Sequence, residues 1–317
     1  MQAPFANSPS IPFWSRVTAT PANFLRYLKQ TPLLLGWLVI GPLIALYLDG
    51  VNGLLQALIN LVLIGVYALI IHRMTPTPPP AELVKRPRLE LTLALGLLAV
   101  TILIQFIDLD VWKVQPLYGW MRVFFATIYR GIDSLQAIPA LFREELFWAV
   151  STTVKQLLPA LFVFALLGYG RRVMGLARPH WKLTGVLLGI TAAFGLLTGV
   201  LTRAPLPEVL GLYLIGIFIN ALPEELFFRG MLLPRLEKML ANPLNALVIS
   251  AVLFNAIHVP IEMNHGASLV EALLGVFSTD YPSGLIWGYL YLRTRSILPG
   301  MLWHAANGHF GFILMDF

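Results

Sequence analysis

The chain has 317 residues, of which 57% are hydrophobic and 12% are charged, and its mean hydropathy is +0.75. Soluble domains carry roughly 25% charged residues, so this composition excludes an ordinary soluble globular protein. The lack of cysteine excludes thiol catalysis, disulfide bonds and thiolate-bound metal. The formal net charge of +6 does not indicate a nucleic-acid partner, because Lys and Arg on the cytoplasmic loops of a membrane protein give the same excess. We therefore expect a protein whose partner is the lipid bilayer.

Long apolar runs predict membrane-spanning helices, each of which needs about 20 mostly apolar residues. We expect an all-α fold, a polytopic transmembrane helical bundle with eight or nine spans. The runs are Leu33–Leu48, Leu54–Ile71, Leu89–Ile107, Leu146–Tyr169, Leu183–Leu201, Val209–Phe228, Leu244–Val259, Gly284–Leu292 and Ile297–Leu314. The segment Tyr118–Ile132 is amphipathic and is expected to lie at the membrane interface instead of crossing.

The chain divides into three regions. Residues 1–32 form a polar tail, expected in the cytoplasm or at the interface, residues 33–182 form accessory transmembrane helices, and residues 183–317 hold the candidate chemistry. Basic loops such as Lys85–Arg88 alternate with acidic ones such as Asp108–Asp110. By the positive-inside rule this alternation places the N-terminus in the cytoplasm. Lys155, a lone cation within a span, is expected to snorkel or to pair with an acid.

A pair of glutamates marks the first candidate site. Glu224 and Glu225 follow the apolar run Val209–Leu222, and Arg229 comes four residues after Glu225. Ionisable groups at mid-bilayer cost roughly 2.5–3.5 kcal/mol each on insertion scales, so they require an explanation. Adjacent helical side chains point about 100° apart, so one glutamate can face a cavity while the other pairs with Arg229. An interfacial Glu–Arg pair without a catalytic role would give the same pattern.

His258 lies on the next apolar run, four residues after Phe254. A turn is expected at Asn242-Pro243, and Glu224 and His258 lie at comparable sequence distances on either side of it. An antiparallel hairpin would therefore bring them to similar depth, where a glutamate and a histidine can deprotonate a water molecule or share a metal ion. The alternative is a histidine that only satisfies hydrogen bonds in the core.

His304 and Asn307 lie on the last run, three residues apart and near one helix face. Their N–H groups are of the kind that stabilises an oxyanion. The alternative for both is hydrogen bonding between helices.

Another segment, Arg143-Glu144-Glu145-Leu146, resembles the first motif superficially. Its arginine precedes the acids, and the acids lie at the start of a span, where they stay hydrated and favour the helix N-terminus. We expect no catalytic role for Glu144 or Glu145.

Three motifs, Glu-Glu-x-x-x-Arg at Glu224–Arg229, Phe-x-x-x-His at Phe254–His258 and a His/Asn motif at His304, occur in this order on separate spans. Together they resemble the CPBP family, which comprises CAAX prenyl proteases and bacteriocin-processing or self-immunity proteins, also called the Abi family. The segment Gly284–Pro299 is also similar to the stretch before that family's last histidine. The similarity covers roughly Leu210–Phe317.

The resemblance implies an intramembrane endopeptidase, acting on a membrane-embedded or lipidated protein or peptide, in a prokaryotic plasma (inner) membrane. It implies that Glu224 and His258 activate water and that His304 and an asparagine support the oxyanion. Glu225 belongs to the same set, and Arg229 and Phe254 support it structurally.

The sequence departs from the family pattern at one position. The family's asparagine usually lies four residues after its last histidine, where this chain has Gly308, and Asn307 comes one residue early. A shift of one residue rotates a helical side chain by about 100°, which puts the oxyanion role of Asn307 in doubt. Asn255 or His309 is then the expected substitute.

Several functional alternatives stay open. No His-Glu-x-x-His zinc helix is present, so we prefer a mechanism without a cofactor, and zinc bound by Glu224, His258 and His304 is the alternative. A non-catalytic immunity or binding protein with the CPBP fold would account for Gly308. A proton-coupled transporter would use the same Glu and His groups, but it predicts inverted repeats that the sequence lacks.

Overall fold

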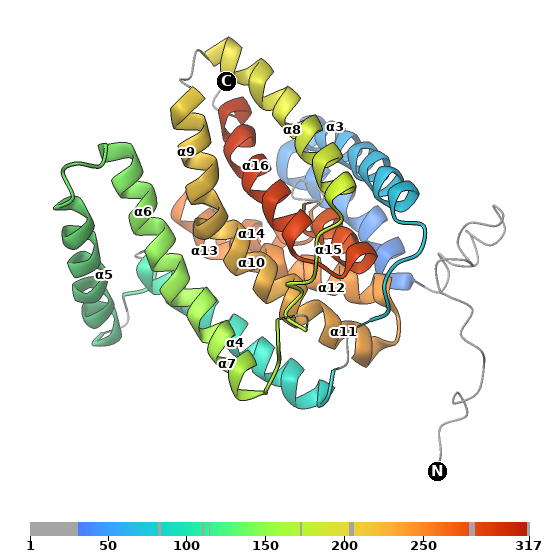
Figure 1. The fold of residues 1–317 in the computed structure, drawn as a ribbon, viewed down its shortest axis with the longest axis horizontal. Helices are drawn as coiled ribbons and strands as arrows, with labels where there is room; N and C mark the ends of the chain where they lie inside the picture. Colours follow the sequence, from blue (N-terminus) through green and yellow to red (C-terminus); the bar gives the residue numbers. More distant parts are fainter. Residues whose placement is uncertain are drawn as a thin grey trace.

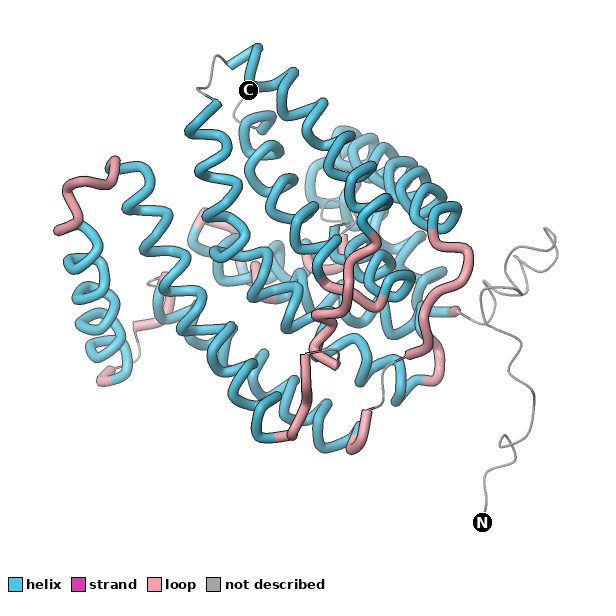
Figure 2. Tube along the Cα trace, viewed as in Figure 1, coloured by secondary structure: helices cyan, strands magenta, loops and turns pink. Residues whose placement is uncertain are grey.

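The computed structural model describes residues 31–81, 84–109, 111–113, 115–171, 173–202, 206–278 and 283–315. Within these ranges the side chains of residues 140–141, 194–202, 206–209, 212 and 307–315 lie outside the description. The described residues form helices and loops, and no strand occurs among them (Figure 2). The predicted all-α fold class is confirmed.

The helices follow one another along the chain. The symbol η denotes a π-helical turn. In chain order they are α3 (Pro32–Met74), α4 (Pro87–Asp108), α5 (Leu117–Asp133), α6 (Ala140–Thr152), η1 (Thr153–Leu157), α7 (Leu158–Leu166), α8 (Trp181–Thr202), α9 (Leu206–Gly216), η2 (Ile217–Ala221), α10 (Leu222–Glu224), η3 (Glu225–Leu232), α11 (Leu233–Leu240), α12 (Pro243–Ala256), α13 (Val259–Asn264), α14 (Leu269–Gly275), α15 (Ser283–Thr294) and α16 (Leu298–Met315).

Each of the nine predicted runs overlaps one helix or a series of consecutive helices. Among the described residues, four segments are long and apolar enough to cross a membrane, namely Pro32–Met74, Pro87–Asp108, Phe142–Leu166 and Pro243–Asn264. The chain is therefore an integral membrane protein, and the count of eight or nine spans stays a prediction. The amphipathic segment forms α5, which pairs with α6 at one side of the bundle (Figure 1).

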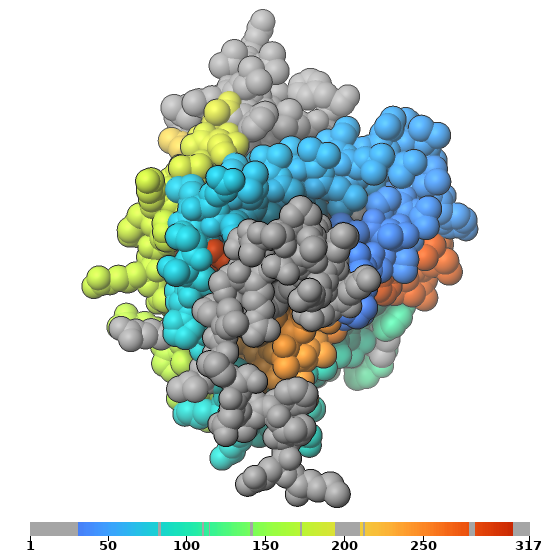
Figure 3. Space-filling view, turned by 90° about the vertical axis from the view of Figure 1, so that its right-hand side faces the viewer, coloured from blue at the N-terminus to red at the C-terminus, as the bar shows by residue number. Residues whose placement is uncertain are grey.

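The first two predicted runs are the two halves of α3. The helix breaks at Gly50, whose φ of 65° and ψ of −146° lie in a region that favours glycine. Just beyond the break the two halves approach closely, because a Cβ on Gly53 would lie 2.3 Å from the carbonyl oxygen of Ala45. Atoms of α3, blue to cyan, spread across one face of the molecule (Figure 3).

The interior of the bundle is built around α12. Helix α12 belongs to the candidate span Pro243–Asn264. In the most apolar part of this span 61% of residues are buried, against 17–28% in the other three candidate spans. Helix α12 packs against α3, α11 and α15, while α16 lies between α8 and α9 (Figure 1). Trp303 Nε1 donates to Thr191 Oγ1 over 2.9 Å and ties α16 to α8. The last third of the chain therefore supplies most of the core.

Proline explains the three π-helical turns. Each turn ends two residues before a proline, η1 before Pro159, η2 before Pro223 and η3 before Pro234. A proline ring inside a helix lacks an N–H donor and clashes with the carbonyl of the preceding turn. Widening that turn relieves the clash, and π-bulges of this kind are frequent at functional sites.

Lys155 is paired within the membrane-spanning region. Its Nζ lies 2.5 Å from Asp108 Oδ2 and 5.1 Å from the centre of the Phe125 ring. The ion pair joins η1 to the end of α4, and the ring contact adds α5. The predicted pairing of Lys155 is confirmed.

We expect Gly53→Ala and Gly65→Ala to change stability in opposite directions. An added methyl at Gly53 meets the Ala45 carbonyl, and overpacking of this kind costs typically 1–3 kcal/mol. A Cβ at Gly65 meets nothing within 4 Å, so the better helix propensity of alanine, about 1 kcal/mol, is retained there. Thermal unfolding of the detergent-solubilised variants measures both, and equal melting temperatures would contradict the close packing of the two halves of α3.

Candidate functional site

The two glutamates lie on either side of a junction between helix types. Glu224 is the last residue of α10, and Glu225 opens the π-helical turn η3. Pro223 lies in α10 just before this junction, and η3, which begins at the junction, is the widened stretch before Pro234. Glu225 is fully enclosed, with an exposed fraction of 0%, whereas Glu224 retains 7%. The two carboxylates therefore have different surroundings.

Glu225 is bound by Arg229. The Arg229 Nη1 atom lies 3.2 Å from Glu225 Oε1, and both side chains are 1% exposed. Arg229 Nη2 donates to the carbonyl oxygen of Gly284 on α15 over 3.0 Å. The guanidinium also lies over the ring of Phe254, 4.6 Å from its centre. This confirms the predicted pairing of one glutamate with Arg229 and assigns it to Glu225.

His304 contacts both glutamates. Its Nδ1 lies 3.2 Å from Glu225 Oε1, within hydrogen-bond distance, and its Nε2 lies 3.6 Å from Glu224 Oε2. The approach of α16 is close because Gly300, one turn before His304, has no side chain: a Cβ there would lie 2.9 Å from Glu225 Oε2. The structure thus brings together Glu224, Glu225 and His304, as the sequence predicted.

His258 joins the cluster through Phe254. The Phe254 ring packs edge-on against His258 and His304, with ring centroids 5.3 and 6.2 Å apart. The predicted run Leu244–Val259 is interrupted, however, because α12 ends at Ala256 and His258 occupies the turn before α13. His258 therefore lies at a turn inside the candidate span Pro243–Asn264, which contains the predicted run. Pro260 accounts for the break, since it lies in the first turn of α13 and has no N–H to donate to the carbonyl of Ala256, the last residue of α12.

Trp287 is a site residue that the sequence motifs did not single out. Its indole stacks on His304 with ring centroids 3.6 Å apart and an interplanar angle of 18°. The Arg229 guanidinium lies 5.6 Å from the Trp287 ring. A tryptophan in an apolar helix normally indicates core packing, so the only available signal was its place in the segment before the last histidine.

The asparagines have different outcomes. The backbone of Asn307 lies in α16, but its side chain lies outside the described residues, as does that of His309. Their oxyanion roles stay predictions. Asn255 is buried and its Nδ2 donates to the carbonyl oxygen of Val276 over 3.1 Å. This bond holds Asn255 to the segment after α14.

A metal ion needs several ligand atoms that converge on one point. Among the described residues, no three histidine or acidic side chains are arranged so that they could hold a metal ion. Glu224, His258 and His304, the predicted zinc ligands, therefore do not form a ready-made set in this arrangement.

Glu144 and Glu145 do not join the cluster. They lie on α6, and the neighbouring Arg143 pairs with Asp133, at 3.4 Å between Nε and Oδ1. Arg143 Nη1 also donates to the carbonyl oxygen of Ile138 over 2.7 Å. The arginine of this segment therefore fastens the loop between α5 and α6.

Residues 206–310 match the family model described as "Type II CAAX prenyl endopeptidase Rce1-like". We call this stretch the CPBP-type domain, after the family that it resembles. The chain is also 37% identical over 98 residues to "Uncharacterized protein YyaK" of Bacillus subtilis (strain 168), which covers 31% of each chain. The match thus spans about a third of that relative's length. No solved structure matches the chain significantly.

The matched region includes every described residue of the cluster. Glu224, Glu225, His258 and His304 all lie within the CPBP-type domain, together with Trp287.

We expect Arg229→Met to be strongly destabilising and the double variant Arg229→Met/Glu225→Gln to recover much of the loss. The single change leaves the enclosed Glu225 charge without a cation, and breaking a buried pair in this way costs about 3–5 kcal/mol. The double change leaves neither charge behind, so the desolvation penalty disappears.

Reversible unfolding in mixed micelles measures these differences. Arg143→Met is the matched control, because Asp133 is half exposed and such pairs contribute about 0–1 kcal/mol. Equal destabilisation of the single and double variants would show that the ion pair does not govern stability at this site.

Proposed function

We propose that this protein is an intramembrane endopeptidase that hydrolyses a peptide bond of a membrane-embedded or lipidated protein or peptide. The observation that carries the proposal is the contact of His304 with both Glu224 and Glu225 inside a CPBP-type domain. The similarity to a Bacillus subtilis protein supports a prokaryotic plasma membrane as the location. No nucleic-acid partner is part of the proposal.

Glu224 is the proposed general base. Glu225 is enclosed and bound by Arg229, whereas Glu224 keeps some exposure and lies beside His304. Glu224 takes a proton from water as the water oxygen forms a bond to the carbonyl carbon of the substrate. General-base assistance of this kind contributes typically 10²–10⁴-fold. His258, whose ring packs against the Phe254 ring, helps to hold that water molecule.

His304 is the proposed oxyanion partner. Glu225 and the stacked indole of Trp287 fix the orientation of its ring, and the proposed role uses the form with a proton on both ring nitrogens. The Nε2–H then faces the side of Glu224, where the negative oxygen of the tetrahedral intermediate develops. Collapse of the intermediate breaks the C–N bond, and the proton held by Glu224 passes to the leaving amine. Asn307 is a proposed second donor to the oxyanion.

We expect Glu224→Gln to reduce proteolysis at least a hundredfold while insertion and folding stay intact, since it removes the base and keeps the size of the side chain. The measurement compares peptide termini in the membrane proteome of cells with wild-type protein and with the variant. Glu144→Gln on α6 is the control and should leave the termini unchanged. Termini that do not differ between wild type and Glu224→Gln would favour a non-catalytic binding or immunity protein.

The preferred mechanism needs no metal, and we expect chelators to leave the purified enzyme active. If Glu224 and His258 alone activate the water molecule, the activity does not depend on the zinc content of the purified enzyme. Activity assays before and after chelation, with elemental analysis of the same samples, test this. Loss of activity on chelation that added zinc restores would instead make Glu224, His258 and His304 ligands.

A further inference from the structure

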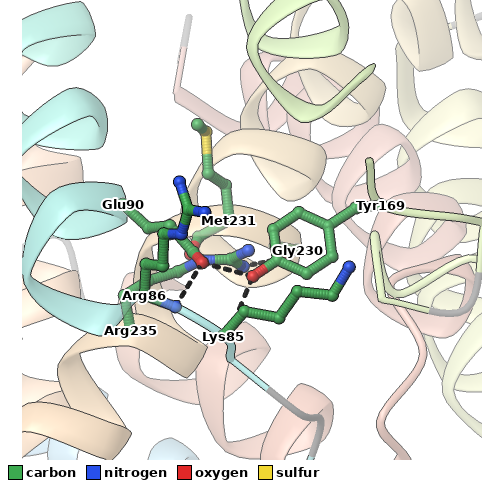
Figure 4. A network of polar contacts seen from close by, with 7 residues as sticks. All are labelled: Lys85, Arg86, Glu90, Tyr169, Gly230, Met231 and Arg235. Atoms are coloured by element: carbon green, nitrogen blue, oxygen red, sulfur yellow. Dashed lines mark hydrogen bonds and ion pairs between the residues drawn. The ribbon is translucent and has the colours of Figure 1, made fainter. Parts of the chain in front are cut away.

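A buried polar network joins three parts of the chain that are far apart in the sequence (Figure 4). The start of α4 contributes Glu90, the loop after α7 contributes Tyr169, and α11 contributes Arg235. Only Arg235 belongs to the region matched by the family model. The network therefore connects the accessory helices to the CPBP-type domain.

Glu90 is the centre of this network. Its Oε2 lies 3.0 Å from Arg235 Nε, and its Oε1 accepts from the backbone N–H of Arg86 over 2.8 Å. The Tyr169 hydroxyl donates to the same Oε1 and accepts from the backbone N–H of Lys85 over 3.0 Å. Glu90 and Arg235 are both 1% exposed. A carboxylate with this many partners has little freedom to move.

Arg235 passes this constraint to the helix of the site. Its Nη1 donates to the carbonyl oxygens of Gly230 at 3.2 Å and Met231 at 3.1 Å, both within η3. Pro234 has no N–H to offer the turn before it, and the guanidinium supplies donors there. The same π-helical turn begins with Glu225 and contains Arg229.

The loop that carries Tyr169 also touches both helices of the site. A Cβ on Gly230 would lie 2.6 Å from the carbonyl oxygen of Met174, so the loop packs directly on η3. The carbonyl of Gly175 accepts from the N–H of Ile297 over 2.8 Å, immediately before α16 begins. Ser296 Oγ donates to the carbonyl of Ala177 over 3.0 Å. One loop thus holds the helix of Glu225 and the helix of His304.

We propose that Glu90, acting through Arg235, is a positioning residue for the reaction that sets the place of η3 against α16. The inference rests on the proposed endopeptidase function. Glu90 touches no reacting group; it fixes the carbonyls of Gly230 and Met231, and thereby the carboxylate that orients His304. A displacement of about 1 Å at such a distance from the chemistry can cost on the order of a hundredfold in rate.

A purely structural role would have a different signature. A buried ion pair contributes little net stability compared with apolar residues of the same size. If the pair only packs α4 against α11, its loss lowers the melting temperature, and each folded molecule keeps its turnover number. If it positions η3, turnover falls among molecules that remain folded.

The test uses Glu90→Gln in the full-length protein, with a quenched-fluorescent transmembrane peptide that carries a cleaved sequence found from the membrane-proteome termini. We expect kcat to fall at least about tenfold and KM to change less than about twofold, because the substrate-binding surface is retained. Glu90→Asp keeps the charge and should recover part of kcat.

Arg235→Lys is the second variant and keeps the experiment decisive if Glu90→Gln does not fold. An ammonium retains the charge opposite Glu90, but it cannot span the carboxylate and two carbonyls as the guanidinium does. We expect a similar fall in kcat from this change. Glu237→Gln is the matched control, because it breaks another ion pair of α11, with Arg295 at 2.6 Å, and both of these residues lie outside η3.

Turnover of Glu90→Gln and Arg235→Lys equal to that of Glu237→Gln, per folded molecule, would overturn the proposal. Hydrogen exchange of the peptide 225–235 separates this result from failure of the proposed function. If exchange is faster there in Glu90→Gln and the wild type cleaves no peptide, the endopeptidase function is contradicted and the constraint of Glu90 on η3 is supported. Unchanged exchange, with normal cleavage by the variant, would remove the positioning role alone.

Discussion

The carboxylate of Glu225 is a charge enclosed in an apolar helix bundle, and such a charge persists only with a cation and hydrogen-bond donors around it. Arg229 supplies the cation from the same π-helical turn, and His304 approaches from α16. Arg229 also donates to the carbonyl of Gly284 on α15. The need to satisfy one buried charge therefore fixes three helices relative to one another.

This constraint gives the adjacent residues Glu224 and Glu225 different roles in the proposed mechanism. Because Glu225 is committed to Arg229, it can hold the His304 ring but is poorly placed to exchange protons with a substrate. Glu224 projects from the α-helical side of the junction, keeps some exposure and faces the other ring nitrogen of His304. The junction lies between the two glutamates, where α10 ends and η3 begins, and η3 is the widened stretch before Pro234. The change of helix type thus helps to give two identical side chains different environments.

The local features of the fold could be predicted from the sequence. Apolar runs gave the positions of the helices, and the four-residue spacing of Glu225 and Arg229 gave their pairing. Asn242 precedes α12 at the predicted Asn-Pro turn, and its side chain accepts from the backbone N–H groups of Leu244 and Asn245. Each of these features depends on neighbours within about one helical turn.

Features that depend on distant contacts were beyond the sequence. The stacking of Trp287 on His304 requires the relative rotation of α15 and α16, which periodicity does not give. Glu90 and Arg235 lie 145 residues apart, and neither belongs to a recognisable motif. The turn at His258 was readable in part, because Pro260 follows it closely, but the apolar run around it concealed the break.

The division into accessory helices and a C-terminal domain follows the position of the motifs in the sequence. It does not follow the contacts that hold the candidate site together. Motifs lie in the C-terminal region, but the guanidinium that binds η3 is itself neutralised by Glu90 from the accessory region. The loop after α7, outside the matched residues, contacts both Gly230 and the start of α16. In a membrane, where lipid is as apolar as the helices and association depends on packing and polar contacts, such buried pairs are a means of holding helices at defined positions. The geometry of the candidate site is thus a property of the whole bundle.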